Sequence, residues 1–242
     1  RKLTKLICSH ADLITVRDQD SLYELRRLGV PTQKVQLTAD SVLTLPQEGK
    51  DLGKGLLNAF HVPADKMLIA ISVRKWQEDD SYLLELAKAA DLLAEEYNAH
   101  IVLLPLQYPV DVEACRRLQH FMRQTAASTV LETACDTEQF LSLMGNFDLL
   151  IGMRLHALIF AAVMELPFVA VSYDPKIDGF VKDINGINAG KVEELQAAQV
   201  VAAVHKALAP EPSAHGMLDK LRAKALLNAQ EAFELLSRGD VR

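Results

Sequence analysis

Cysteine is scarce in this sequence, and the spacing of the few cysteines favours no structural role for them. Three occur among 242 residues, at Cys8, Cys115 and Cys135. Their number is odd, they lie far apart, and none belongs to a CxxC pair, so neither a disulfide framework nor a zinc site is indicated. We therefore expect a protein of the reducing cytoplasm.

Long apolar runs and an excess of basic residues are also missing. The clearest apolar run, Ala157 to Met164, is typical of a buried helix and is far shorter than the roughly 18 residues that a membrane span needs. Lys and Arg total 26 against 32 for Asp and Glu, which gives a formal net charge of -6. A general nucleic-acid binder needs a net basic surface, so we expect no nucleic-acid partner. Because the apolar run is too short, we expect no membrane span.

Several signatures of ligand sites are absent as well. The chain has no P-loop and no GxGxxG, which argues against nucleotide hydrolysis and dinucleotide redox chemistry. The acidic residues show no recognised spacing of metal ligands, so no metal site is predicted. The N-terminus, Arg1-Lys2-Leu3, has no initiator Met and no apolar signal core, and we expect a truncated or processed chain. Surface or capping roles are expected for six of the seven histidines: His10, His61, His100, His120, His205 and His215.

Apolar strands and amphipathic helices alternate regularly through the middle of the chain. Such alternation predicts a parallel sheet, and strands that are apolar on both faces need helices on both sides. We therefore predict an α/β, Rossmann-like fold. The expected strands are residues 67–73, 101–104, 129–131, 147–151 and 167–172, and the expected helices are 81–97, 110–124, 137–144, 154–165 and 177–183.

Three segments are predicted along the chain. Residues 1–50 form an inter-domain segment with part of an N-terminal domain and the hinge, and they lead into a polar, Gly-containing linker that ends near Gly55. Residues 51–210 form the Rossmann-like domain. A Pro-rich turn at residues 209–212 then leads to a C-terminal helix in 211–242, which packs back on the rest.

The strongest candidate for chemistry is the segment from Asp148 to His156, where an apolar strand ends at Gly152 and a helix begins with basic residues. In open α/β folds the ligand site lies beyond the carboxyl ends of the strands, where helix N-termini offer N–H groups to anions. Gly152 permits close backbone approach, Arg154 offers a bidentate fork for phosphate or carboxylate, and His156 supplies an imidazole for proton transfer. Together these groups suit a phosphorylated acid.

A structural interpretation of the same residues is also open. Arg154 pairs in that case with a carboxylate such as Asp148 or Asp178, and His156 caps backbone groups.

Basic residues follow other predicted strands too. Arg17 comes after residues 13–16, Arg74 and Lys75 come after 69–73, and Lys176 follows 167–172. Arg17 is equally consistent with a helix start capped by one of the aspartates that follow it, and Lys176 with a solvated lysine. We predict that the basic residues bind an anionic substrate.

The segment 151–157, followed by 161–167 and Val171-Ser172-Tyr173-Asp174-Pro175-Lys176, resembles the polysaccharide pyruvyl transferase family. Supporting matches are Val16-Arg17-Asp18 with Ser21, residues 28–30, and Thr38-Ala39-Asp40-Ser41. The resemblance extends over roughly residues 9 to 210 and is strongest to the branch that modifies S-layer-anchoring, secondary cell-wall polymers. It implies the C-terminal half of a glycosyltransferase B (GT-B) fold, with residues 51–210 as the donor-binding catalytic domain.

The resemblance also implies roles for individual residues. Arg17 and Arg154 become ligands of phosphoenolpyruvate, His156 the catalytic acid or base with Arg154 beside it, and Lys176 a supporting cation. Arg74 is our own addition from the strand-end argument. No cofactor or metal is implied, since phosphoenolpyruvate is the donor substrate. The implied acceptor is a sugar, with lipid linkage of that sugar left open, and the implied location is the cytoplasm at the inner face of the membrane.

Two rival functions follow from the same fold class. One is a GT-B glycosyltransferase that uses a nucleotide sugar, for which Asp178 is a weak candidate for a ribose ligand. The other is a non-catalytic domain that kept the fold. Retention of Arg17, Arg154 and His156 argues against the second. The family's N-terminal domain, with its Gly-rich segment, is not represented in this chain, which leaves acceptor recognition open.

Overall fold

The structure is a computed structural model that describes residues 1–209 and 215–237. The chain divides into two compact units, one made of Arg1–Leu45 with Ala214–Arg242 and the other of Pro46–Ser213. The expected Pro-rich turn lies outside the described residues from position 210 on. The domain limits expected from the sequence stay a prediction.

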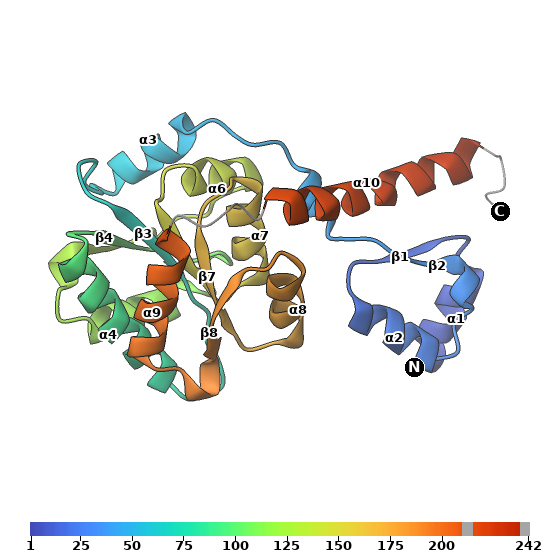
Figure 1. Cartoon of the computed structure of the whole chain (residues 1–242), viewed down its shortest axis with the longest axis horizontal. Coiled ribbons are helices and arrows are strands. Elements are labelled where there is room, and N and C mark those ends of the chain that lie inside the picture. The colour runs from blue at the N-terminus through green and yellow to red at the C-terminus, as the bar shows by residue number, and fades with distance from the viewer. Residues whose placement is uncertain (210–214, 238–242) are drawn as a thin grey trace. The chain divides into compact units, whose positions relative to one another are not determined.

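The second unit is built on a six-stranded, fully parallel sheet (Figure 1). Its spatial order is β5-β4-β3-β6-β7-β8, which becomes 3-2-1-4-5-6 when the strands are counted along the chain. This is a doubly wound order whose direction reverses between β3 and β6. The strands are β3 (Leu68–Ser72), β4 (His100–Leu103), β5 (Ser128–Val130), β6 (Leu149–Gly152), β7 (Phe168–Ser172) and β8 (Ile187–Lys191).

Helices cover both faces of this sheet, as the two-sided apolar strands require. One layer contains α4 (Ser81–Glu96), α5 (Val112–Phe121) and α9 (Ala197–Leu208). The other contains α3 (Asp51–Ala59), α6 (Thr137–Met144), α7 (Leu155–Val163) and α8 (Pro175–Asp183). The predicted α/β parallel-sheet fold is thus confirmed for this unit. Short 3-10 turns at Thr125–Ala127 and Val192–Glu194 precede β5 and α9.

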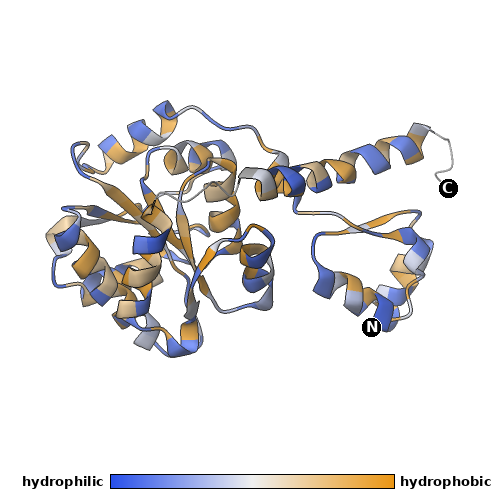
Figure 2. Ribbon diagram, in the orientation of Figure 1, coloured by the Kyte–Doolittle hydropathy of each residue, from blue (hydrophilic) through white to orange (hydrophobic). Residues whose placement is uncertain are grey.

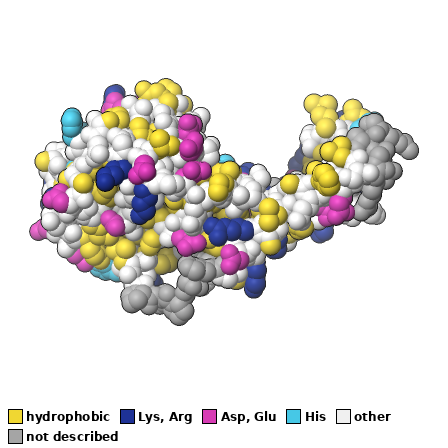
Figure 3. Space-filling view, turned by 90° about the horizontal axis from the view of Figure 1, so that it is seen from above, with side chains coloured by type: hydrophobic (Ala, Val, Ile, Leu, Met, Phe, Trp, Pro, Cys, Tyr) yellow, Lys and Arg dark blue, Asp and Glu magenta, His cyan; other side chains and the backbone are white. Residues whose placement is uncertain are grey.

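The core lies between the sheet and these helices. Every residue of β3, β4 and β6 is buried, and Figure 2 shows these strands as the apolar centre of the unit. Ile69 and Ile71 of β3, and Val73 directly after it, pack under α4, α5 and α9. The intervening residues, among them Ser72 and Gly152, belong to the other face. Charged side chains of both signs are interspersed on the surface shown in Figure 3.

The first unit contains a two-stranded parallel sheet of β1 (Ile14–Val16) and β2 (Val35–Leu37). Its helices are α1 (Lys2–His10), α2 (Gln19–Arg27) and α10 (His215–Ser237), with 3-10 turns at Thr32–Lys34 and Ser41–Thr44. Asn228 on α10 donates to the carbonyl oxygen of Ala39 (3.0 Å) and accepts from the Thr38 hydroxyl (2.8 Å). The C-terminal helix therefore packs against the segment that follows β2.

The sequence predicts a linker that ends near Gly55. This prediction is wrong for residues 51–55, because helix α3 begins at Asp51. The sequence suggests a loop because Gly53 and Gly55 interrupt the segment. In the structure, Gly53 is where α3 meets α6: its N–H donates to Ser142 Oγ (2.8 Å), and a Cβ there would lie 2.5 Å from the Ser142 carbonyl oxygen. The glycine is needed for close helix packing. Helix α1 and strand β8 were also absent from the prediction.

Replacing Gly53 with Ala should lower the free energy of unfolding by about 1–3 kcal/mol, because the new methyl group meets backbone that must move. Gly55 is a matched control on the same helix, since a Cβ there has nothing within 4 Å. Gly55→Ala should stabilise the chain by up to about 1 kcal/mol through helix propensity. Urea unfolding measures both values, and equal effects of the two substitutions would contradict the packing role of Gly53.

Candidate active site at the carboxyl edge of the sheet

The predicted anion-binding residues of the second unit meet where the strand order reverses. Strands β3 and β6 are neighbours there, with Ser72 in register with Gly152, and Met153 N–H donates to the Ser72 carbonyl (2.9 Å). Arg74 and Arg154 each follow this register pair by two residues. The crevice beyond such a reversal is the usual ligand site of open α/β sheets.

Gly152 allows helix α7 to start close to the sheet. A Cβ at Gly152 would lie 2.8 Å from Leu158 Cδ2, so a larger residue would require the buried Leu158 side chain to shift. Arg154 is the N-cap of α7 and provides no side-chain cap. The first N–H groups of a helix have no intrahelical partner and carry the positive end of its dipole. The start of α7 is therefore suited to an anion.

Arg154 is held by a carboxylate that the sequence did not single out. Its Nε donates to Asp111 Oδ2 (3.0 Å), and its Nη2 donates to Asp111 Oδ1. The Arg154 side chain is 15% exposed and that of Asp111 is 0% exposed. This bidentate pair fixes the guanidinium, cancels its net charge, and leaves the N–H groups on Nη1 for a ligand.

The proposed structural partners of Arg154 have other roles. Asp148 accepts a hydrogen bond from Leu68 N–H (2.7 Å), and Asp178 accepts one from Asn188 Nδ2 (3.0 Å). Pairing of Arg154 with a carboxylate was a correct alternative, but the partner is Asp111. The sequence predicts a helix from residue 110, which places Asp111 in its first turn, whereas the structure begins α5 at Val112 with Asp111 as its N-cap. The residue was therefore missed as a partner of Arg154.

Arg74 adds positive charge and hydrogen-bond donors to the site. Its Nη1 donates to Tyr173 Oη (3.0 Å), its Nε donates to the Lys75 carbonyl (3.2 Å), and its Cζ lies 4.9 Å from the centre of the Tyr173 ring. No carboxylate forms an ion pair with Arg74 among residues 1–209 and 215–237. Arg74 therefore presents both positive charge and hydrogen-bond donors at this edge.

Aromatic residues support the Arg74 loop. The Trp76 and Tyr173 rings lie 4.9 Å apart. Tyr82 Oη donates to the Arg74 carbonyl (2.6 Å) and accepts from Trp76 N–H (3.2 Å). Burial raises the pKa of Tyr82 to about 12, so the phenol stays protonated and able to donate at neutral pH.

Two buried polar atoms at this edge lack a hydrogen-bond partner in the described part of the chain. They are Ser72 Oγ, on a residue with 0% exposure, and Trp76 Nε1. Buried polar groups are almost always paired, so both atoms are available for a hydrogen bond with a further partner.

The remaining predicted residues of this unit lie at the same edge. His156 is half-buried in the first turn of α7. Lys176 is exposed in the first turn of α8, where its N–H donates to the N-cap Asp174 (2.9 Å). Lys75 forms an exposed ion pair with Glu78 (2.9 Å). The structure thus brings Gly152, Arg154, His156, Arg74 and Lys176 to one edge.

Arg17 belongs to the first unit and has carboxylate partners of its own. It follows β1, forms an ion pair with Asp40, and lies 4.0 Å from Asp18. Asp18 is the N-cap of α2, accepting from Ser21 N–H (2.7 Å). The helix-start interpretation of this segment is therefore correct, and it leaves Arg17, whose side chain is 36% exposed, at the carboxyl end of β1.

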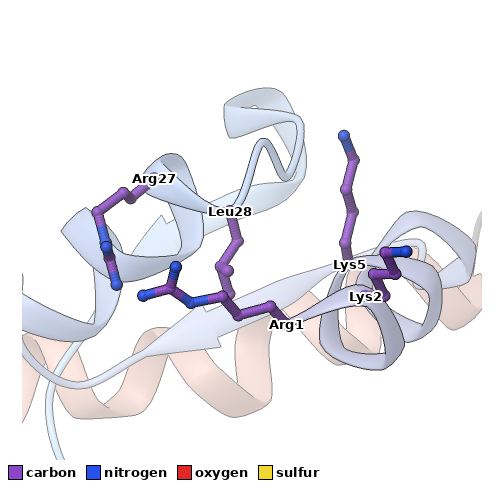
Figure 4. Close-up of a pocket in the computed structure, with 5 residues that line it drawn as sticks. All are labelled: Arg1, Lys2, Lys5, Arg27 and Leu28. Carbon is purple, nitrogen blue, oxygen red and sulfur yellow. The ribbon is translucent and has the colours of Figure 1, made fainter.

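A separate basic pocket of about 240 Å³ occurs in the first unit (Figure 4). It is lined by Arg1, Lys2, Lys5, Arg27 and Leu28. Arg27 ends α2, whereas Arg17 precedes the start of that helix, so the pocket lies at the opposite end of α2 from the predicted residue. Arg27 also pairs with Glu24 (2.8 Å).

Two further properties concern the described residues as a whole. No group of three or more His, Cys, Asp or Glu side chains in them is placed to hold a metal ion. None of their helices combines the length and apolar character required to cross a membrane.

Comparison with known proteins gives both a family and a fold. A family model described as polysaccharide pyruvyl transferase matches residues 1–175. No curated protein matches the chain with significant similarity. Among solved structures, UDP-GlcNAc 2-epimerase from Methanocaldococcus jannaschii superposes with a TM-score of 0.67 at 12% identity, covering 96% of this chain and 64% of that protein.

Two further solved structures give similar results. Anabaena HepE, solved with UDP and glucose, superposes with a TM-score of 0.60 at 13% identity. The superposition covers 98% of this chain and 66% of the HepE chain. Escherichia coli ADP-heptose LPS heptosyltransferase II superposes with a TM-score of 0.55 at 15% identity. The superposition covers 67% of this chain and 52% of the heptosyltransferase. These similarities confirm the predicted GT-B-like fold. The chain spans less than two thirds of the length of each of these structures.

Proposed function

Because the chain belongs to the polysaccharide pyruvyl transferase family, we propose that it moves the enolpyruvyl group of phosphoenolpyruvate onto two hydroxyl groups of a sugar. The product is a pyruvate ketal on a cell-surface polysaccharide precursor, and phosphate is released. The finer assignment to secondary cell-wall polymers that anchor an S-layer is part of this proposal, as is action in the cytoplasm at the inner face of the membrane.

The observation that carries the proposal is the pair of arginines at the strand-order reversal. Arg154 is oriented by Asp111 beside the start of α7, and Arg74 has no ion-pair partner among the described residues. Phosphoenolpyruvate bears a phosphate and a carboxylate, so it needs donors for two anionic groups. We assign Arg74 and the α7 N-terminus to the phosphate, with Lys176 at the rim, and Arg154 Nη1 to the carboxylate.

The reaction requires a proton to be added and two C–O bonds to form. A proton is added to C3 of phosphoenolpyruvate, and a sugar hydroxyl attacks C2 and loses its own proton. A second hydroxyl then replaces the phosphate at C2, which leaves as inorganic phosphate. We assign proton delivery to His156, because it is the imidazole in the first turn of α7. Donors at the phosphate stabilise the charge that builds up as it leaves.

Arg17, which belongs to the first unit, stays a predicted ligand of phosphoenolpyruvate, as the family resemblance implies. Its ion pair with Asp40 orients the guanidinium as Asp111 orients that of Arg154. This scheme uses no metal and no cofactor.

Calorimetric titration of the whole chain with phosphoenolpyruvate tests the donor site. We expect saturable binding of phosphoenolpyruvate. Arg154→Ala should weaken this binding by about 10- to 100-fold, because charge-assisted hydrogen bonds to the ligand are lost. Arg154→Ala leaves the buried Asp111 unpaired, so the variant Arg154→Met/Asp111→Leu is the better probe, because replacing a buried pair with apolar residues preserves folding.

A matched control is Arg116→Gln, which removes an exposed arginine that pairs with Glu132 at the surface. It should bind phosphoenolpyruvate like the wild type. UDP serves as the competitor ligand: tighter binding of UDP than of phosphoenolpyruvate would favour a nucleotide-sugar glycosyltransferase. Wild-type affinity in Arg154→Met/Asp111→Leu would remove this edge from donor binding.

A further inference from the structure

Trp76 and Tyr173 form an aromatic surface at the same edge as the proposed donor site. They follow β3 and β7, the strands on either side of β6. Their rings lie 4.9 Å apart with planes inclined at 51°, and both are half-buried against the core. Large aromatic side chains left partly open at a ligand edge supply most of the contact area of small-molecule sites.

The indole N–H of Trp76 is buried. Its Nε1 is shielded from solvent and makes no hydrogen bond within the described residues. The main chain of Trp76 is fixed through Tyr82 Oη (3.2 Å), so the backbone of the residue is already placed. A buried donor without a partner destabilises the ligand-free protein, and a hydrogen bond to a ligand oxygen would offset that cost.

Arg74 joins this aromatic surface to the donor site. It donates to Tyr173 Oη (3.0 Å) and lies beside the Tyr173 ring. A ligand on the two rings therefore lies next to the cation assigned to the phosphate of the donor. The polar groups of this surface, Trp76 Nε1 and the remaining N–H groups of Arg74, are donors.

We propose that Trp76 and Tyr173 bind a pyranose ring of the acceptor sugar. The apolar C–H face of a pyranose packs on an aromatic ring, and its hydroxyl oxygens accept from the donors around it. This inference rests on the proposed function and identifies the residues that hold the acceptor beside phosphoenolpyruvate. It also gives a purpose to the unpaired indole N–H, which donates to a ring hydroxyl.

The chain supplies its own probe, because Trp76 is the single tryptophan of the sequence. Tryptophan emission of the whole chain is titrated with the methyl β-glycosides of glucose, galactose and mannose, with and without phosphoenolpyruvate. Sorbitol at equal concentration controls for bulk solvent. We expect at least one pyranoside to change the emission saturably, and Tyr173→Ala to weaken that response at least about tenfold.

Two more variants separate binding from folding. Tyr23→Ala removes an exposed tyrosine of the first unit, 65% accessible, and should keep the wild-type response. Trp76→Phe retains an aromatic ring without the N–H, and calorimetry should show weaker pyranoside binding in it than in the wild type. Circular dichroism melting confirms that each variant is folded.

The outcomes are distinct from those of the donor experiment. Absence of a saturable response to all three pyranosides, or an undiminished response in folded Tyr173→Ala, would overturn the acceptor assignment while leaving phosphoenolpyruvate binding intact. A pyranoside response without phosphoenolpyruvate binding would support the sugar site and remove the proposed transfer reaction. A response to UDP that exceeds that to every pyranoside would assign the rings to a nucleotide instead.

Discussion

Asp111→Asn is expected to lower the free energy of unfolding of the chain by about 3–5 kcal/mol. The substitution removes the charge of a carboxylate with 0% exposure and leaves the Arg154 guanidinium, only 15% exposed, without a counter-ion. Asp111 Oδ2 also accepts from Gln107 N–H (2.9 Å), so the change affects the loop before α5 as well. Urea denaturation followed by circular dichroism measures the loss.

The matched comparison is Glu132→Gln, which breaks an ion pair with Arg116 at the surface. Exposed pairs contribute little to stability, so this variant should unfold close to the wild-type midpoint. A further comparison is Arg154→Met/Asp111→Leu, which should recover most of the stability that Asp111→Asn loses. If Asp111→Asn unfolds with the same midpoint as Glu132→Gln, the buried pair does not orient Arg154.

His156→Ala is expected to reduce turnover by about 10²–10⁴-fold, the usual contribution of a general acid or base. The imidazole is assigned to proton transfer, so phosphoenolpyruvate should still bind with nearly wild-type affinity. Release of inorganic phosphate from phosphoenolpyruvate, in the presence of the pyranoside that perturbs Trp76, gives the turnover. Calorimetry on the same samples gives donor binding.

The control for this experiment is His120→Ala, which removes an exposed histidine in the last turn of α5. Its phosphate release should match that of the wild type. Unchanged turnover in His156→Ala would exclude His156 from the chemistry, whereas loss of both turnover and donor binding would make it a binding residue.

Much of the fold was predictable because the signals were local. Apolar runs bounded by polar residues indicated β3, β4, β5, β6 and β7, and the helix predicted at residues 137–144 has the bounds of α6. Strand β8 lacks that signal, because Ile187–Lys191 contains Asn188 and Gly190 and is only partly buried. Helix α3 was missed because a glycine such as Gly53 usually indicates a loop in a sequence. In the structure, Gly53 instead allows α3 to pack closely against α6.

The site was predictable in part for the same reason. The rule that ligands lie beyond the carboxyl ends of strands led from the sequence to Arg74, Arg154 and Lys176. The partners of these residues were not predictable, because they depend on which strands are neighbours. Asp111 lies after β4 and Tyr173 after β7, so their contacts with Arg154 and Arg74 follow from the order of strands in the sheet.

The reversal of strand order also decides when in folding the site comes into existence. Arg74 and Asp111 belong to the half of the sheet formed by β3, β4 and β5, and their partners Tyr173 and Arg154 belong to the half formed by β6, β7 and β8. Each cross-contact joins segments far apart in sequence, so neither half alone holds the complete set of ligands. If phosphoenolpyruvate binds only when all of these residues are in place, it stabilises the folded domain by mass action. Its concentration in the cell would then influence how long a protein molecule survives before proteolysis.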